Sequence, residues 1–367
     1  MPGRPLACGL HARATCRSPA LDDTDPLRHY TARVLVTVAI GALALLLWKL
    51  SGLLLLVFGA VVLAVALRAL MAGVTRWTPL SDGVALTLVA LALAAGFSLL
   101  MWLFGSQLAV EIEGLRQGLP AAWSLFQDWL EQSPIGPAVR DVLDEAQGSA
   151  SAMAARAGAL AMSATGSLAN LLLVVVGGIY LAAQPALYRS GVLKLFPAGS
   201  RATLGEALDA SGHALKLWLG GQLLAMAVVG VLTGIGLWLL GVPVALGLAV
   251  ITALLNFVPI IGPIAAAVPA VLLAFTVSPQ IGLATLALYL VVQQVESNVL
   301  QPLIQQRAVD LPPALLLFSL FGVGALFGIT GLLLAAPLTV VLYVLVKCLY
   351  VREVLETEAQ VPTPDAD

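Results

Sequence analysis

Long apolar runs separated by short polar segments dominate the chain. Several of them are close to the roughly 20 residues that a helix needs to cross a bilayer. These runs cover residues 33–48, 52–71, 83–106, 166–187, 217–240 and 281–300. The pattern predicts an all-α membrane protein. Only Lys49, Ser51 and Gly52 interrupt the first two runs, which predicts a tight helical hairpin between them.

Two further apolar runs, residues 244–276 and 314–346, are too long for one regular span, and both are interrupted. The first contains Asn256–Pro263, where two prolines and a glycine cannot continue one regular helix. The second contains glycines at positions 322, 324, 328 and 331. Each run is either a broken helix or a re-entrant hairpin, whose irregular backbone must be shielded by protein or line a water-filled cavity. Such interruptions are typical of transporters, and the runs together predict about eight transmembrane helices.

Residues 107–165 differ from the rest because they are charged and amphipathic. Seven acidic residues stand against three basic ones, and large apolar residues recur at helical spacing from Leu115 to Leu130. We expect an amphipathic helical region outside the bilayer, between spans 3 and 4. It is either a vestibule or subunit-contact element, or a solvated cap packed on the spans.

The distribution of charge predicts the orientation and the order of segments. Lys and Arg cluster in residues 1–33, 68–76 and 189–216, and the positive-inside rule places these segments and both termini in the cytoplasm. In chain order, we expect a disordered cytoplasmic tail (1–30), transmembrane helices 1–3 (31–106), the amphipathic extramembrane region (107–165), transmembrane helix 4 (166–188), a cytoplasmic linker and charged helix (189–216), a C-terminal transmembrane core (217–348) and a cytoplasmic tail (349–367).

Composition agrees with a membrane protein and excludes several other classes. The 367 residues are 60% hydrophobic and 10% charged, with a mean hydropathy of +0.99, whereas soluble domains carry about 25% charged residues. The net charge of −2 gives no indication of a nucleic-acid partner. The three cysteines lie near the chain ends, in no metal-ligand spacing. Because the sequence has no GxSxG, HExxH or P-loop motif, it indicates neither an enzyme nor a bound cofactor.

The candidate chemistry lies in residues 293–313, which hold all the charged residues within residues 217–346. These charged residues are Glu296, Arg307 and Asp310. A carboxylate in a membrane core is costly, so it is usually functional or specifically paired. On a helical wheel, Glu296 flanks a polar face that consists of Gln293, Gln294, Ser297, Asn298, Gln301 and Gln305.

Two interpretations of Glu296 are open. In the first it is a coupling or gating carboxylate, and the amides of the polar face line a solute path. In the second it forms a structural lock with Arg307 or Lys216. Arg307 and Asp310, three positions apart, either pair with each other at the membrane surface or contribute to the site.

The interruption in the first long run is the second candidate element. Its backbone is shaped by Asn256, Pro259, Gly262 and Pro263. They form either an unwound element beside the solute path or a plain bend between two helices.

With these motifs, the chain resembles the autoinducer-2 exporter family of bacterial permeases over roughly residues 30–350. Asn256–Pro263 is similar to that family's F-I/V-P-x-I/L-G-P element, and Glu296–Pro302 is similar to its E-x-x-V/L-L-x-P element. Gly328–Leu338 is similar to its terminal G-x-x-G-x-x-L-A-x-P-L signature. Pro312 stands where histidine is common in the family, which removes support for a proton relay at that position.

The resemblance implies a homo-oligomeric, multi-pass protein of the bacterial inner membrane that moves a small solute. Family members are credited with exporting a quorum-sensing signal, and some with exchanging sodium or lithium for protons. We therefore expect a secondary transporter in the lipid bilayer that exports a small polar solute or signal molecule, with a proton or sodium as coupling ion. The alternatives are a sodium(lithium)/proton antiporter and, from another class, a membrane scaffold or accessory protein, although a scaffold gains nothing from unwound backbone.

Overall fold

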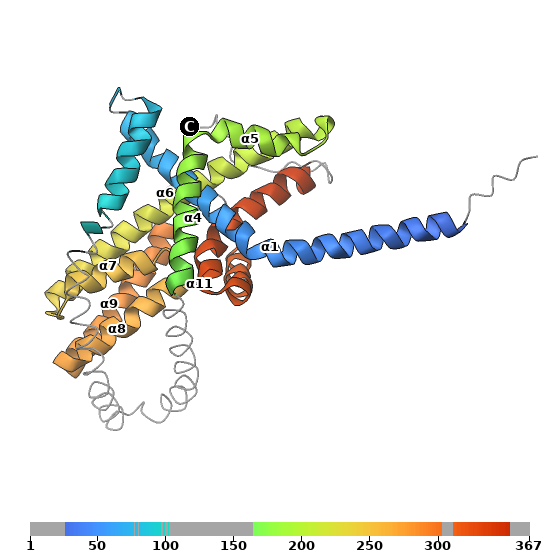
Figure 1. The fold of residues 1–367 in the computed structure, drawn as a ribbon. Coiled ribbons are helices and arrows are strands. Elements are labelled where there is room, and N and C mark those ends of the chain that lie inside the picture. The colour runs from blue at the N-terminus through green and yellow to red at the C-terminus, as the bar shows by residue number, and fades with distance from the viewer. Residues whose placement is uncertain are drawn as a thin grey trace, which may run out of the picture. The chain divides into compact units, whose positions relative to one another are not determined.

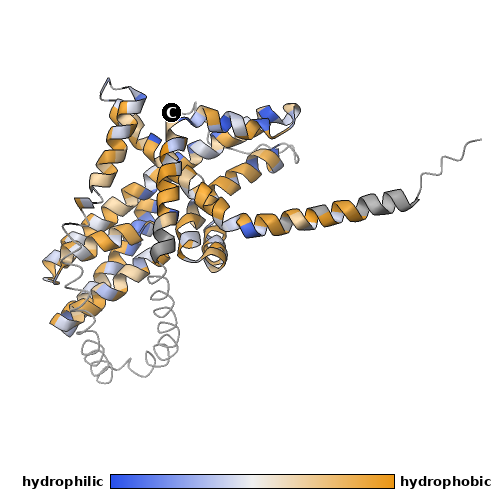
Figure 2. Cartoon of the chain, viewed as in Figure 1, coloured by the Kyte–Doolittle hydropathy of each residue, from blue (hydrophilic) through white to orange (hydrophobic). Residues whose placement is uncertain are grey.

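The computed structural model describes residues 26–76, 78–79, 81–96, 98–99, 102, 164–302 and 311–352. The chain divides into two compact units, Met1–Ser51 and Gly52–Asp367. Every regular element in the described ranges is a helix, which confirms the all-α fold (Figure 1). Hydrophobic residues cover most of these helices (Figure 2). Many large apolar side chains are exposed, as expected of a protein that is surrounded by lipid.

Helix α1 (Pro26–Thr75) is continuous through Lys49 and Gly52, so the predicted tight hairpin is wrong. This polar segment contains no proline, and one glycine inside a helix costs only about 1 kcal/mol. The Ser51 hydroxyl donates a hydrogen bond to the carbonyl of Trp48 at 2.6 Å, which satisfies the hydroxyl within the helix itself. A short polar segment without a strong helix breaker is therefore compatible with one long helix.

Helix α4 (Ala164–Ala183) packs closely against the second part of α1. An added Cβ on Gly178 would lie 2.8 Å from the side chain of Leu63, so a glycine is needed for the two helices to approach this closely. Arg68 of α1 donates a hydrogen bond to the carbonyl of Ala182, in the last turn of α4, at 3.1 Å. The chain then bends by 93° into α5 (Pro185–Lys194).

A short 3₁₀ turn, η1 (Ala198–Ser200), leads into α6 (Arg201–Leu239), which is one continuous helix. Its first part carries Glu206 and Asp209, and its second part is apolar. The predicted boundary at residue 216 therefore lies inside a regular helix, and a charged segment and a span are joined without a break. The predicted segment boundaries otherwise stay predictions.

The first over-long run forms a helical hairpin. Its arms are α7 (Ala245–Leu255) and α8 (Ile261–Val277), and α6, α7, α8 and α9 (Pro279–Val295) lie side by side (Figure 1). Leu248 near the start of α7 and Ala274 near the end of α8 share one buried cluster. A helix with a simple bend would hold these residues far apart, so the run folds back at residues 256–260. With 11 and 17 residues, each arm is shorter than the roughly 20 residues of a full span.

The second over-long run, α11 (Pro313–Val346), also folds back on itself. Gly328 has φ 63° and ψ −143°, a conformation that residues with a Cβ rarely adopt. The Thr339 hydroxyl donates a hydrogen bond to the Ser319 hydroxyl at 2.6 Å, although one straight helix would place these residues about 30 Å apart. Both over-long runs are therefore hairpins, and a π-helical segment, η3 (Lys347–Arg352), follows the second.

Engineered cysteines test the reversal at Gly328. In a variant without the native cysteines, we expect Ser319→Cys together with Thr339→Cys to form a disulfide in most molecules under mild oxidation, because the two hydroxyl groups are in contact. Mass spectrometry of proteolytic fragments measures the yield. Phe318→Cys with Thr339→Cys is the control and is expected to stay reduced, since Phe318 is exposed. A straight helix would leave both pairs reduced.

The described residues contain four helical stretches that are long and apolar enough to cross a bilayer, or five if α4 and α5 count as one span. By length and composition alone, the four are Val34–Thr75, Ala198–Leu239, Pro279–Leu300 and Pro313–Arg352, of which the last folds back at Gly328. The helix Asp82–Gly96 and the arms α7 and α8 are apolar but shorter. The total of about eight spans stays a prediction. The expected amphipathic region lies outside the described residues, apart from its last two residues, 164 and 165, with which α4 begins.

Candidate functional site

Glu296 is buried in the helical bundle at the end of α9, with 6% of its surface exposed. The buried side of α9 carries Thr285, Tyr289 and Val292, and Glu296 continues this side at helical spacing. A π-helical turn, η2 (Glu296–Leu300), begins at this residue. Such turns within α-helices are frequently found at functional sites.

Asn256 and Gln222 connect Glu296 to the break between α7 and α8, residues 256–260, which forms the tip of the first hairpin. The side-chain amide of Asn256 donates a hydrogen bond to Glu296 Oε1 at 3.1 Å. Gln222 of α6 donates from Nε2 to the main-chain carbonyl of Asn256 at 2.6 Å. All three side chains are more than nine-tenths buried. The network therefore joins α6, α9 and the break at one point.

The backbone of the hairpin tip is strained and tightly packed. Ile260 has φ 70°, a region that bulky residues rarely occupy, and it directly precedes α8. An added Cβ on Gly262 would overlap the carbonyl of Leu255. Pro259 is half-buried, and Pro263 is buried in the first turn of α8, where its missing N–H removes no helical hydrogen bond. These residues together give the break its shape.

Apolar contacts hold the tip in place. Val258 is buried in one cluster with Leu320 and Ala335, which lie on the two arms of α11. Phe257 packs edge-to-face against Trp218 of α6, with the ring centroids 6.1 Å apart. The tip of the first hairpin therefore contacts both α6 and the second hairpin.

A second polar contact lies one helical turn before the break. The hydroxyl groups of Thr252 and Tyr289 are 2.8 Å apart and buried. The hydroxyl of Thr285, which lies one turn before Tyr289 in α9, is buried and has no hydrogen-bond partner in the described part of the chain. With Asn256 and Glu296, these residues form a line of polar groups between α7 and α9 in otherwise apolar surroundings.

The structure separates Glu296 from most of the predicted polar face. Ser297, Asn298 and Gln301 are exposed. The side-chain amide of Asn298 donates hydrogen bonds to the main-chain and side-chain carbonyls of Gln294, at 2.9 and 2.8 Å. These contacts stay within one helix. Glu296 thus points into the protein, while this face of the helix points out of it.

Gln293 occupies a third environment. It is half-buried and lines, with Pro263 and Tyr289, an apolar groove of about 430 Å³ between α8 and α9. The predicted candidates therefore divide into a buried site at Glu296 and Asn256, an exposed polar face, and this groove.

The predicted lock between Glu296 and Lys216 is not formed. Lys216 is exposed, and Glu296 Oε2 has no hydrogen-bond partner among the residues that the structure describes. Arg307 and Asp310 lie outside those residues. In the described part of the chain, Glu296 is therefore bonded to an amide rather than to a cation.

The site offers buried acceptor oxygens, which are the kind of group that pairs with a proton, a cation or a hydroxyl group. Glu296 Oε2 and Asn256 Oδ1 are both buried acceptors, and neither has a hydrogen-bond partner within the described ranges. A buried acceptor left unsatisfied costs about 1–3 kcal/mol, and more when it is charged. A species that offers a hydrogen-bond donor or a positive charge to either oxygen would therefore be stabilised there.

Gln222, Thr252 and Tyr289 were not among the residues that the sequence pattern singled out. Each is an isolated polar residue within a long apolar run. That isolation is the signal that could have found them, because polar groups inside a membrane span usually face protein rather than lipid. Tyr289 also lies on the same side of its helix as Glu296.

Comparison with known proteins finds relatives along most of the chain. A family model described as AI-2E family transporter matches residues 35–350. A presumed transport protein of Mycobacterium tuberculosis (strain CDC 1551 / Oshkosh) is 30% identical over 349 residues, which cover 87% of this chain and 91% of that protein. YrrI of Bacillus subtilis (strain 168), also a presumed transport protein, is 34% identical over 166 residues, which cover 45% of this chain and 47% of YrrI.

A further relative carries a more specific name. The AI-2 transport protein TqsA of Escherichia coli (strain K12) is 30% identical over 151 residues, which cover 40% of this chain and 41% of TqsA. The chain thus spans nearly the whole mycobacterial protein but less than half of YrrI and of TqsA.

Proposed function

The chain belongs to the AI-2E family of transporters, and on this premise we propose that it is a secondary transporter that exports a small polar solute through the bacterial inner membrane. One observation carries the proposal: the buried Glu296 is bonded to the break of a helical hairpin and has no cation partner in the described part of the chain. An ionisable residue placed in this way inside a membrane is a functional site by default. The sequence has no P-loop, so in this proposal transport draws on an ion gradient or is facilitated diffusion.

In this proposal Glu296 is the coupling carboxylate and Asn256 transmits its state to the hairpin. A hydrogen bond to a charged carboxylate is about twice as strong as one to a neutral group. Binding of a proton or sodium ion at Glu296 would therefore weaken its hydrogen bond with Asn256 and loosen the attachment of the tip to α9. Gln222 keeps the main chain of Asn256 attached to α6 during this change.

The remaining candidates belong to the solute path in the same proposal. Pro259, Gly262 and Pro263 give the hairpin tip its shape beside the path. Ser297, Asn298 and Gln301 form its water-facing mouth, because exposed amides at a helix end are unfavourable in lipid. Arg307 and Asp310 follow this mouth along the chain. Both termini lie in the cytoplasm, and the protein is a homo-oligomer.

A sodium(lithium)/proton antiporter is the second candidate function. It is favoured by the two unpartnered oxygens, Glu296 Oε2 and Asn256 Oδ1, because hard cations prefer carboxylate and carbonyl oxygen ligands. In this case the coupling ion is itself the cargo.

Reconstitution in liposomes tests both functions. We expect the protein to move at least one solute from a panel of small polar molecules, with AI-2 included because TqsA is named for it. The measurement follows the release of each labelled solute with and without a proton or sodium gradient. A dye that reports internal pH, read on addition of sodium or lithium, tests the antiporter. Liposomes that move neither solute nor ions would contradict both functions and favour a scaffold.

A further inference from the structure

The short helix α5 exposes several large apolar side chains. None of its residues is buried, although it carries several large apolar side chains. Leu187, Tyr188 and Val192 are 60%, 41% and 44% exposed, and Leu195, which follows the helix, is 83% exposed. At helical spacing these residues share one side of α5. An apolar stripe of this kind is unfavourable in water and needs an apolar environment.

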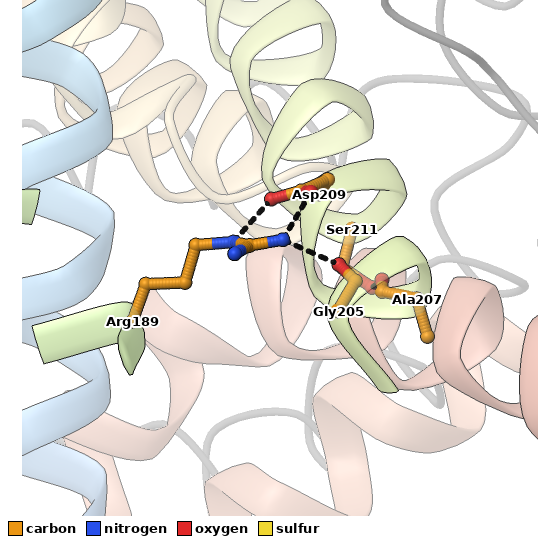
Figure 3. A network of polar contacts seen from close by, with 5 residues as sticks. All are labelled: Arg189, Gly205, Ala207, Asp209 and Ser211. Carbon is orange, nitrogen blue, oxygen red and sulfur yellow. Dashed lines mark hydrogen bonds and ion pairs between the residues drawn. The ribbon is translucent and has the colours of Figure 1, made fainter. Parts of the chain in front are cut away.

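The other side of α5 is held against α6. Arg189 donates two hydrogen bonds to the carboxylate of Asp209, at 2.8 and 2.5 Å, and a third to the carbonyl of Gly205 at 3.3 Å (Figure 3). Gly205 has no side chain, and the side chain of Leu193 reaches the same place. The hydrogen bonds to Asp209 raise the pKa of Arg189, so its charge is kept. The apolar stripe therefore points away from α6.

The bend between α4 and α5 decides how α5 is oriented. It begins directly after α4, from which it is bent by 93°, so its axis lies along the bilayer plane when α4 crosses the bilayer. With 10 residues it is about 15 Å long, half the thickness of the hydrocarbon core. The charged Arg68 binds the last turn of α4, which marks the polar boundary at the same end.

From this geometry we infer that the apolar stripe of α5, formed by Leu187, Tyr188, Val192 and Leu195, is a membrane-surface anchor that inserts into the lipid interface. Lys194 lies at the edge of the stripe, is exposed and makes no ion pair among the described residues. With the stripe inserted, its ammonium group would lie at the level of the lipid phosphates, which attract it. Helices with an apolar face and flanking cations bind the interface in this way. The partner is the phospholipid bilayer surface itself.

The contact between Arg189 and Asp209 connects the anchor to the helix that carries Gln222. Through Asp209 it attaches α5 to α6, the helix that carries Gln222 and thereby holds the hairpin break. A helix fixed in the interface would set the depth of α6 while the hairpin tip moves. The two charged side chains are 44% and 48% exposed, so this attachment depends on its paired geometry and weakens with salt.

Spin labels on the full-length protein in lipid nanodiscs test the anchor. Single cysteines at positions 187 and 195 (Leu187→Cys and Leu195→Cys, native cysteines replaced) carry the label, and Glu206→Cys, in the exposed charged part of α6, is the control. Accessibility to oxygen and to a nickel chelate gives the depth of each label. We expect both α5 labels to lie about 5–10 Å below the phosphates, with oxygen access higher and nickel access lower than at position 206. Lys194→Gln is expected to make both labels shallower in nanodiscs that contain phosphatidylglycerol, and to change nothing in phosphatidylcholine alone.

Three results would overturn the inference. Labels as accessible to nickel as the control would place α5 in water. A depth near the bilayer centre would make α5 the second part of a broken span. Low accessibility to both reagents would show that protein covers the stripe, either another part of this chain or a second copy.

Discussion

Replacing Glu296 with Gln is expected to lower solute flux about tenfold or more while the protein keeps its fold. Gln has nearly the same size as Glu, and its carbonyl oxygen can still accept the hydrogen bond from Asn256. It cannot take up a proton or balance the charge of a cation, so coupling is lost. Removal of a buried carboxylate also removes its desolvation cost, and the thermal midpoint is expected to stay equal or to rise. Flux into liposomes and thermal unfolding in detergent measure the two effects.

Glu206→Gln is the matched control for this substitution. It makes the same chemical change on α6, where Glu206 forms an exposed ion pair with Arg352 at 3.0 Å. Exposed pairs contribute about 0–1 kcal/mol, so flux and stability are expected to stay near those of the unaltered protein. If Glu296→Gln loses flux and stability together, Glu296 has a structural role. If it keeps its flux, Glu296 is not the coupling residue.

The helices could be predicted from hydropathy, but the points of chain reversal only in part. Asn256–Pro263 was found because its prolines cannot continue a regular helix. Lys49–Gly52 looked similar by polarity but contains no proline, and the helix continues through it. Among the glycines of the last run, only Gly328 has a positive φ, and composition does not distinguish it from Gly322 or Gly324.

The candidate site, too, could be predicted from the sequence only in part. Glu296 could be found because an isolated carboxylate in an apolar run is costly wherever the run folds. Its partner Asn256 is 40 positions away, and Gln222 is a further 34 positions from Asn256, so their contacts exist only because the first hairpin folds back between α6 and α9. A helical wheel gives the angle between Glu296 and the amides. It does not say which side of the helix faces the protein.

Gly262→Ala is expected to cause the largest loss of stability among single substitutions at the site. The added Cβ would overlap the carbonyl of Leu255, a main-chain atom that cannot move without moving the tip. Forcing extra atoms into a packed position costs on the order of 3 kcal/mol, which lowers the thermal midpoint of a chain of this length by roughly 3–5 °C. Asn256 follows Leu255 directly, so its contacts with Gln222 and Glu296 are displaced and flux falls as well.

Gly220→Ala separates this effect from the general effect of replacing a helical glycine. Gly220 lies in α6, and an added Cβ there would meet nothing within 4 Å. Alanine is favoured over glycine inside a helix by about 1 kcal/mol, so the thermal midpoint is expected to stay equal or to rise slightly. Both variants make the same covalent change and differ only in what surrounds the new methyl group. If Gly262→Ala proved as stable as Gly220→Ala, the hairpin would not turn where Gly262 meets Leu255, and the link between the break and Glu296 would lose its structural basis.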